Sequence, residues 1–327
     1  MTDGDTPSRQ AWVAVDIGGT KIAAGLVDDA DRVRERIRVS TPVGAAAVLD
    51  AVARLVHELR WHADGRGIAV RAVGVGAPGV IDPTTGTVCA ATEILPGWAG
   101  TRVGDELRRR TGLPVAVAND VRVAGIGVAH DPAVAPYREI LHVSVGTGVG
   151  GALLRHGVAS SGPHASSGEL AHLIVPAHGV IPCGCGRHDH LEAVVAGPAI
   201  AATYAERRGV DAPSLIEVVA RMRAGDRIAD EVVGAAGRLL GRALAGLVAA
   251  VDVDAVTLGG GVALHVTEFV DAVRDAFRAE ALAPLRSVPV LVPATGADTA
   301  LRGAAHLARS AVAGHRRHDA AFRQESA

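Results

Sequence analysis

One local pattern occurs twice in this chain, and it restricts the possible folds more than any other feature. Within residues 12–27, two apolar runs predict buried strands, joined by Asp16-Ile17-Gly18-Gly19-Thr20-Lys21. A Gly-Gly turn of this kind is typical of a tight hairpin. Residues 140–154 repeat the arrangement around Gly146-Thr147-Gly148. The repetition predicts a duplicated α/β fold with one Gly-rich hairpin in each half.

Both Gly-rich turns suit phosphate binding, although an ordinary hairpin would have the same sequence. Glycine amides and a threonine hydroxyl can close around phosphate oxygens. Asp16, at the end of the first predicted strand, can hold Mg²⁺ directly or through water. Two G-x-G-x-x-G matches, at residues 74–79 and 146–151, run into a turn and a strand. The dinucleotide fingerprint requires a helix at that point, so we exclude a Rossmann-type site.

A second candidate site follows the strand predicted at residues 115–118. Asn119 and Asp120 stand at its end; Asn119 is the only asparagine in the chain and Lys21 the only lysine. A carboxylate near a substrate hydroxyl can take its proton during attack on a phosphoryl group, which accelerates the reaction roughly 10²–10⁴-fold. Phosphoryl transfer otherwise requires positioning and charge neutralisation, which the hairpins, Mg²⁺ and Lys21 can supply. The alternative for this pair is an ordinary turn after a strand.

The third candidate site is a metal-binding loop within residues 168–192. Four of its side chains offer the nitrogen and sulfur ligands of a tetrahedral zinc ion, namely His172, Cys183, Cys185 and His190. Glu169 and Glu192 flank these ligands, so a metal would fix the loop that presents both carboxylates. The alternative is a histidine-rich surface loop with two incidental thiols.

Composition narrows the range of partners. A net charge of -2 gives no electrostatic reason to expect nucleic acid or an anionic membrane. The apolar run at residues 243–251 is too short to span a bilayer, and residues 1–10 lack the features of a signal peptide. Three cysteines do not make a disulfide framework. We therefore expect a cytoplasmic protein that binds neither nucleic acid nor membrane.

Eight short motifs occur in order along the chain: AVDIGGTK (14–21), GVGAPGVID (74–82), LPGW (95–98), VAND (117–120), VSVGTGVGG (143–151), GELAH (168–172), CGCGRHDHLE (183–192) and LGGGV (258–262). Together they resemble the ROK family of sugar kinases and sugar-responsive repressors, from about Trp12 to Ala308. The resemblance implies two actin/hexokinase-like lobes, each a ribonuclease H-like α/β domain, with an active-site cleft between them. We assign residues 1–118 and 299–327 to the N-terminal lobe, and 119–298 to a C-terminal lobe with the zinc loop and sugar site.

The resemblance also implies roles for individual residues. Asp120 is the expected catalytic base, and the expected sugar-binding residues are Asn119, Asp120, Glu169, His172 and Glu192. The expected ATP- and phosphate-binding residues are Asp16, Gly18, Gly19, Thr20, Lys21, Thr147, Gly148, Gly260 and Gly261, of which the last two lie near the nucleoside. Structural zinc is expected on His172, Cys183, Cys185 and His190. Mg²⁺ is expected on Asp16, so the implied cofactors are ATP, Mg²⁺ and Zn²⁺.

The chain departs from the family pattern in the zinc loop and before the LPGW-like segment. Where the family's zinc motif ends in a third cysteine, this chain has His190, preceded by Asp189 in place of glycine; His188 is the alternative ligand. Before the LPGW-like segment an asparagine is usual, but the chain reads Thr92-Glu93-Ile94. A carboxylate at Glu93 would pair with the ammonium group of an amino sugar.

The resemblance leaves the hexose open, and it leaves open ATP or polyphosphate as the phosphoryl donor. We expect an ATP-dependent hexose kinase that phosphorylates the 6-hydroxyl of glucose or a related amino-hexose, such as kanosamine or N-acetylmannosamine. The alternatives are a sugar-sensing regulator of the same family and a non-catalytic sugar-binding protein. The family's repressors carry a DNA-binding domain ahead of the lobes, whereas only a short segment precedes the first expected strand, which favours the enzyme. Family members form dimers or tetramers, so we expect a homodimer or homotetramer.

Overall fold

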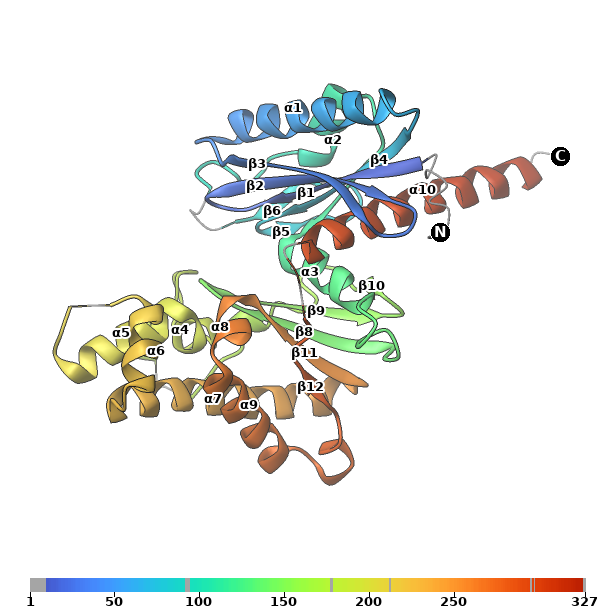
Figure 1. Cartoon of the computed structure of the whole chain (residues 1–327). Coiled ribbons are helices and arrows are strands. Elements are labelled where there is room, and N and C mark those ends of the chain that lie inside the picture. Colours follow the sequence, from blue (N-terminus) through green and yellow to red (C-terminus); the bar gives the residue numbers. More distant parts are fainter. Residues whose placement is uncertain are drawn as a thin grey trace, which may run out of the picture. The chain divides into compact units, whose positions relative to one another are not determined.

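The chain divides into two compact units (Figure 1). The computed structural model describes residues 10–91, 95–176, 179–211, 213–294, 296 and 298–325, with side chains to residue 312 in the last helix. The first unit comprises Met1–His130, Ser161–Ser166 and Thr295–Ala327, and the second comprises Asp131–Ser160 and Ser167–Ala294. Each unit is built around one five-stranded sheet.

The sheet of the first unit has the strand order β3-β2-β1-β4-β7. Its strands are β1 (Gln10–Ile17), β2 (Lys21–Asp28), β3 (Val33–Ser40), β4 (Ala69–Ala77) and β7 (Val115–Asn119). β1 pairs antiparallel with β2, with Ile17 opposite Ile22, and parallel with β4, which is itself parallel to β7. The predicted first hairpin is therefore confirmed. A small separate sheet pairs β5 (Val80–Ile81) with β6 (Val88–Ala90).

Helices cover both faces of this sheet (Figure 1). The helices α1 (Ala45–Asp64) and α2 (Val103–Thr111) lie on one face, and α3 (Asp120–Ala129) and α10 (Thr299–Glu325) lie on the other. Side chains alternate between the faces along a strand. The alternation along β1 sends Val13, Val15 and Ile17 into the core beneath α1, and Trp12 and Ala14 into the core beneath α10. Both faces are buried, which is why β1 reads as a nearly continuous apolar run.

The contact of α10 with its neighbours is close enough to require glycine. A Cβ atom added at Gly74 of β4 would lie 1.8 Å from the carbonyl oxygen of Ala304 on α10. A Cβ atom added at Gly303 of α10 would lie 1.8 Å from the carbonyl oxygen of Val123 on α3. Because glycine has no Cβ, the backbones of β4, α10 and α3 approach one another directly.

The sheet of the second unit has the strand order β10-β9-β8-β11-β12. Its strands are β8 (Glu139–Val145), β9 (Val149–Arg155), β10 (Val158–Ala159), β11 (Ala255–Gly259) and β12 (Val290–Leu291). The helices of this unit are η1 (Leu170–His172), α4 (Glu192–Val195), α5 (Gly197–Arg208), α6 (Leu215–Arg223), α7 (Arg227–Val251), α8 (Gly260–His265), α9 (Thr267–Glu280) and η2 (Ala283–Leu285). The second predicted hairpin, β8–β9, is confirmed, with Val145 opposite Val149.

The long helix α7 belongs to the core of the second unit. Among the described residues it alone is long and apolar enough to cross a membrane, yet half of its most apolar window is buried. It packs against α9 through two glycines: a Cβ atom at Gly237 would lie 2.6 Å from the carbonyl oxygen of Phe269, and one at Gly241 would lie 2.3 Å from that of Val273. Its apolar composition is therefore explained by helix packing within the unit.

The two sheets share one topology, which confirms the predicted duplication and the α/β fold class. In each sheet the first strand, β1 or β8, is central. On one side lies its hairpin partner, antiparallel to it, followed by a strand that is antiparallel to that partner. On the other side lie two strands that run parallel to the central strand. Each half therefore presents a Gly-rich hairpin beside the carboxyl ends of parallel strands.

The helix α3 lies in the first unit, whereas the lobe boundary expected from the resemblance fell before Asn119. This helix packs on α10 and β4. Its Arg122 is buried and donates a hydrogen bond of 2.7 Å to the carbonyl oxygen of Ala165, which holds the segment Ser161–Ser166 in the same unit. The lobe limits inferred from the resemblance stay a prediction.

We expect Gly303→Ala to destabilise the first unit by about 1–3 kcal/mol, because the added methyl group would overlap the backbone of α3. Thermal unfolding monitored by circular dichroism would measure the effect. Gly246→Ala is the matched control, since a Cβ atom at this exposed position of α7 meets open space. It should stabilise its helix by about 0.5–1 kcal/mol. Equal midpoints for the two variants would contradict the close contact.

Candidate active site

Three strands of the first unit bring candidate residues to one edge of the sheet. Asp16 on β1 pairs with Gly76 on β4, which pairs with Ala118 on β7. The carboxyl ends of parallel strands meet at the same edge, so Asn119 and Asp120 emerge beside Asp16. A Cβ atom added at Gly76 would lie 3.5 Å from Asp16 Oδ1 and 3.5 Å from Asp120 Cα. The structure thus places two carboxylate-bearing residues next to one glycine.

The environment of Asp16 affects its ionisation. Burial raises the pKa of this carboxyl above its ordinary value, and the positive charge of Lys21 acts in the opposite direction. The Gly18 amide donates to the Lys21 carbonyl at 2.9 Å, and the Thr41 hydroxyl donates to the Gly18 carbonyl at 2.6 Å, which fixes the turn. Gly19, Thr20 and Lys21 are exposed at this turn. Their exposure and the constrained loop are compatible with the predicted phosphate binding.

The side chain of Asn119 has a structural function. Its Oδ1 accepts hydrogen bonds from the amides of Val121 (3.0 Å) and Arg122 (3.2 Å), which caps the N-terminus of α3. Its Nδ2 donates to the Gly79 carbonyl at 3.1 Å. An asparagine amide has two donor hydrogens and two acceptor lone pairs, so one donor hydrogen is left for a substrate. The sequence pattern did not reveal that Asn119 fixes the start of the helix that carries Asp120.

In the second unit, the carboxylate of Glu192 contacts the Gly-rich turn. Glu192 Oε2 accepts a hydrogen bond of 2.9 Å from the amide of Val149, and a Cβ atom added at Gly148 would lie 2.7 Å from the same oxygen. The turn itself is closed by a 2.9 Å bond from the Gly146 amide to the Gly148 carbonyl. Thr147 is exposed at its tip. Glu192, a predicted sugar-binding residue, therefore lies against the predicted phosphate-binding turn.

Gly260 and Gly261, which follow β11, form the first turn of α8. Gly260 has a φ of 81°, and a Cβ atom there would lie 2.4 Å from the Val145 carbonyl oxygen. A Cβ atom at Gly146 would lie 3.7 Å from the Gly261 amide nitrogen, whereas one at Gly261 meets open space. The start of α8 is therefore a neighbour of the Gly-rich turn and is open to a ligand.

A buried histidine that the sequence analysis missed lies beside this glycine segment. His142 Nδ1 is 3.0 Å from the hydroxyl oxygen of Thr257, and burial lowers the pKa of His142 to about 4. A Cβ atom at Gly259 would lie 3.0 Å from the His142 ring. The sequence signal for it is a titratable residue within the largely apolar run 140–145. The neutral ring fills the space against which the glycine segment packs.

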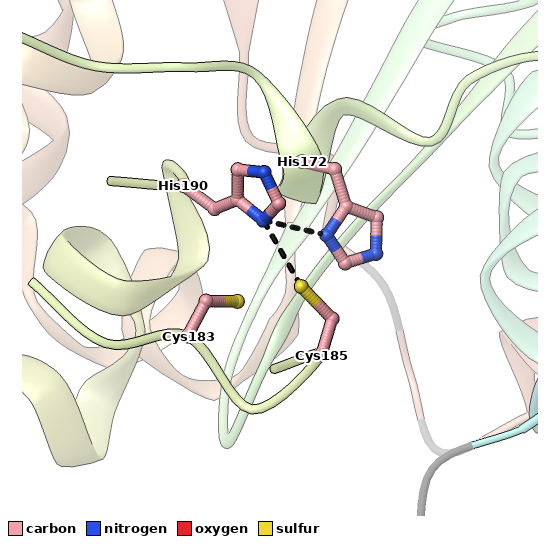
Figure 2. A group of neighbouring side chains, drawn as sticks. All are labelled: His172, Cys183, Cys185 and His190. Carbon is pink, nitrogen blue, oxygen red and sulfur yellow. Dashed lines mark hydrogen bonds between the residues drawn. The ribbon is translucent and has the colours of Figure 1, made fainter. Parts of the chain in front are cut away.

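The four predicted zinc ligands converge in the second unit (Figure 2). The ligand atoms of His172, Cys183, Cys185 and His190 all lie within 4.8 Å of one another. His190 Nδ1 is 3.2 Å from His172 Nδ1 and 3.2 Å from Cys185 Sγ. Tetrahedral zinc with bonds of about 2.0–2.3 Å separates its ligands by about 3.3–3.8 Å. Two thiols and two imidazole nitrogens at these distances fit zinc.

The structure distinguishes the two candidate histidines of this loop. His190 is buried among the ligands, whereas His188 is exposed and its ligand atoms are not part of the cluster. Asp189, which separates them, has a left-handed backbone with a φ of 58°, a conformation that glycine adopts without cost. The sequence pattern alone gives Asp189 no evident function. Burial raises the pKa of the Cys183 thiol, so a metal would be needed to favour its thiolate.

The remaining sugar-binding candidate, Glu169, directly precedes η1, at whose end His172 lies. Gly168, with a φ of 86°, lies against β9, and a Cβ atom there would be 2.8 Å from the Gly151 carbonyl oxygen. The structure therefore brings together the candidates of each unit separately. The first unit holds Asp16, Gly18, Gly19, Thr20, Lys21, Asn119 and Asp120, and the second holds Thr147, Gly148, Glu169, His172, Glu192, Gly260 and Gly261. Glu93 lies outside the described residues.

Comparisons relate this geometry to known proteins. The sequence model of the ROK family matches residues 12–311. The N-acetylmannosamine kinase of Escherichia fergusonii is 31% identical over 256 residues, which cover 77% of this chain and 83% of that protein. The crystal structure of the ROK hexokinase from Thermus thermophilus has a TM-score of 0.83 at 33% identity, covering 93% of this chain and 99% of the other. A ROK family glucokinase from Streptomyces griseus, in complex with glucose and AMPPNP, has a TM-score of 0.77 at 30% identity, covering 92% and 99%.

We expect the purified protein to contain zinc and Cys183→Ser to lose it, because the substitution removes one of four converging ligands. Metal analysis by mass spectrometry after gel filtration would measure the content. Cys89→Ser is the matched control, since Cys89 is exposed on β6 in the first unit. Full zinc occupancy in Cys183→Ser would show that the ligand set is wrong.

Proposed function

The chain belongs to the ROK family, and from this premise we propose that it is an ATP-dependent sugar kinase acting on the 6-hydroxyl of glucose or a related amino-hexose. The observation that carries the proposal is the position of Asp16 and Asp120 beside Gly76. Phosphoryl transfer needs a group that orients the attacking hydroxyl and a carboxylate that holds the metal ion near the phosphates. These two residues supply both from one edge of the sheet.

In the proposed reaction, Asp120 is the general base. Its carboxylate takes the proton of the sugar 6-hydroxyl as the 6-oxygen forms a bond to the γ-phosphorus of ATP. The bond from this phosphorus to the β,γ-bridging oxygen breaks, and ADP leaves. The N-cap of Asn119 supports this assignment, since it fixes the first turn of the helix in which Asp120 is the first residue. Fixing the base in this way orients Asp120 before the sugar binds.

The Gly-rich turns are the proposed phosphate-binding elements. Exposed residues of the first turn, Gly19 and Thr20, and Thr147 of the second, would bind phosphate oxygens through backbone amides and hydroxyls. Lys21 adds the positive charge at the first turn. When bound, Mg²⁺ would neutralise charge on the phosphate groups, and Asp16 would hold it.

The second unit supplies the proposed sugar-binding groups. Glu169, His172 and Glu192 lie on or next to the loop that carries the four zinc ligands. A structural zinc would cross-link this loop, as in other closed sites with four protein ligands. Glu192 also bonds the amide of Val149, so one side chain links the sugar-binding loop to the phosphate turn. This placement supports a site in which sugar and nucleotide are bound together.

We expect Asp120→Asn to lower kcat roughly 10²–10⁴-fold with little change in sugar affinity, because it removes the base but keeps the side-chain volume. A coupled ADP-release assay across glucose, mannose, N-acetylmannosamine, N-acetylglucosamine, glucosamine and kanosamine would measure turnover. Asp64→Asn, at the exposed end of α1, is the control. Unchanged turnover in Asp120→Asn would remove Asp120 from its role. No turnover on any sugar, in folded zinc-containing protein, would favour a regulator or a non-catalytic sugar-binding protein.

The raised pKa of Asp16 predicts a pH-dependent requirement for Mg²⁺. Burial favours the protonated carboxyl, and the metal ion binds only the ionised form. As the pH falls through the raised pKa, protons compete with the metal, so the Mg²⁺ concentration for half-maximal activity should rise. Steady-state assays at several pH values in wild type and Asp16→Asn would measure it. The same pH dependence in both proteins would assign the titration to another group.

A further inference from the structure

Asp189 occupies a position in the zinc loop where its backbone and its charge each carry a cost. Its φ of 58° lies in the left-handed region, which disfavours residues with a Cβ atom. The residue is only 6% exposed, so its carboxylate has given up most of its water. A buried carboxylate is stable only where hydrogen-bond donors replace that water. The contacts of Asp189 show which donors do so.

Both carboxylate oxygens accept backbone hydrogen bonds from one short segment. Oδ1 accepts from the Ile181 amide at 2.9 Å, and Oδ2 accepts from the Gly179 amide. The carboxylate therefore binds this segment at both of its oxygens. The segment 179–181 ends two residues before Cys183, the first thiol of the cluster.

The backbone of Asp189 holds the loop from two sides. Its amide donates to the Ile181 carbonyl at 2.8 Å, and its carbonyl accepts from the Val175 amide at 2.7 Å. Val175 follows His172 by three residues, and His190 is the next residue along the chain. Asp189 therefore connects the three chain segments that carry His172, Cys183 and His190.

We propose that Asp189 is a positioning residue that arranges the zinc ligands before the metal binds. The inference rests on the proposed zinc site. The hydrogen bonds by which Asp189 braces the loop, however, need no metal. Its carboxylate holds segment 179–181, so the thiols of Cys183 and Cys185 face the two histidine rings while the site is empty. Metal binding then orders less of the loop, and zinc affinity rises accordingly. Glu192 and His172 also keep their places when zinc is removed.

Two substitutions separate the charge of Asp189 from its backbone conformation. Asp189→Gly removes the carboxylate but suits the left-handed backbone better than aspartate does. Asp189→Asn keeps the size and tolerates the conformation but removes the negative charge. If the carboxylate is the brace, zinc affinity falls in both variants, and it falls in Asp189→Gly although the backbone is relaxed. Substitution of groups that support metal ligands typically lowers metal affinity roughly 10–100-fold.

The first measurement is the zinc dissociation constant, obtained by competition with a chromogenic chelator on full-length protein. We expect a roughly 10–100-fold weaker constant for Asp189→Gly and a loss in the same direction for Asp189→Asn. Asp254→Asn is the matched control, because Asp254 also accepts two backbone amides, those of Arg138 and Glu139, outside the zinc loop. Its zinc affinity should equal that of wild type. Zinc binding by Asp189→Gly that is as tight as wild type would overturn the proposal.

The second measurement is amide hydrogen exchange in the zinc-free proteins. The Gly179 and Ile181 amides should be protected in wild type and Asp254→Asn, and should exchange faster in both Asp189 variants. Equal exchange rates of these amides in all four proteins would show that Asp189 does not brace the loop. A wild-type protein that binds no zinc would refute the proposed metal site, while the exchange rates would still decide whether Asp189 braces the loop. Far-ultraviolet circular dichroism establishes that each variant is folded.

Discussion

The first unit depends on direct backbone contact between its last helix and elements formed much earlier in the chain. Gly74 of β4 and Gly303 of α10 each occupy a position at which a Cβ atom would lie 1.8 Å from a carbonyl oxygen of the neighbouring element. The helix α10 can therefore rest on β4 and against α3 without intervening side chains. Because α3 begins at Asp120, the residues after 298 determine where the proposed base is held.

The second unit holds its candidate groups in place by other interactions. Its candidate groups lie on a loop with little regular structure, and hydrogen bonds and ligand atoms replace helix packing there. Glu192 accepts the Val149 amide and so joins this loop to the hairpin β8–β9. The buried, neutral His142 packs against Gly259 at the start of the glycine segment. Zinc and Asp189 are proposed to hold the remainder, one by coordination and the other by hydrogen bonds.

The duplicated topology gives each unit a Gly-rich hairpin, but the functional candidates beside the two hairpins differ. In the first unit the hairpin β1–β2 lies beside Asp16 and Asp120 at the sheet edge. In the second unit the hairpin β8–β9 lies beside Glu192 and the start of α8. In the proposed function, the first copy carries the general base and the magnesium ligand, and the second carries the candidate zinc ligands and further sugar-binding groups. The proposed activity requires both sets.

The sequence by itself determined the features that arise from neighbours along the chain. The two Gly-rich hairpins and the α/β duplication follow from local periodicity and turn chemistry, and the structure confirms them. The sequence also supplied the residue types of the candidate zinc ligands, since two thiols and nearby histidines in one loop can form a tetrahedral site, but its spacing alone left an ordinary histidine-rich loop as the alternative.

Only the tertiary structure decided the features that depend on distant pairings. It selected His190 over His188, because the left-handed backbone at Asp189 directs successive side chains to different environments. It placed α3 in the first unit, because contacts with α10 and β4 outweigh the chain connection to the second. It also assigned Asn119 to the helix cap and Asp189 to the loop amides. Such assignments depend on which groups are close in space, and spacing along the chain does not encode those distances.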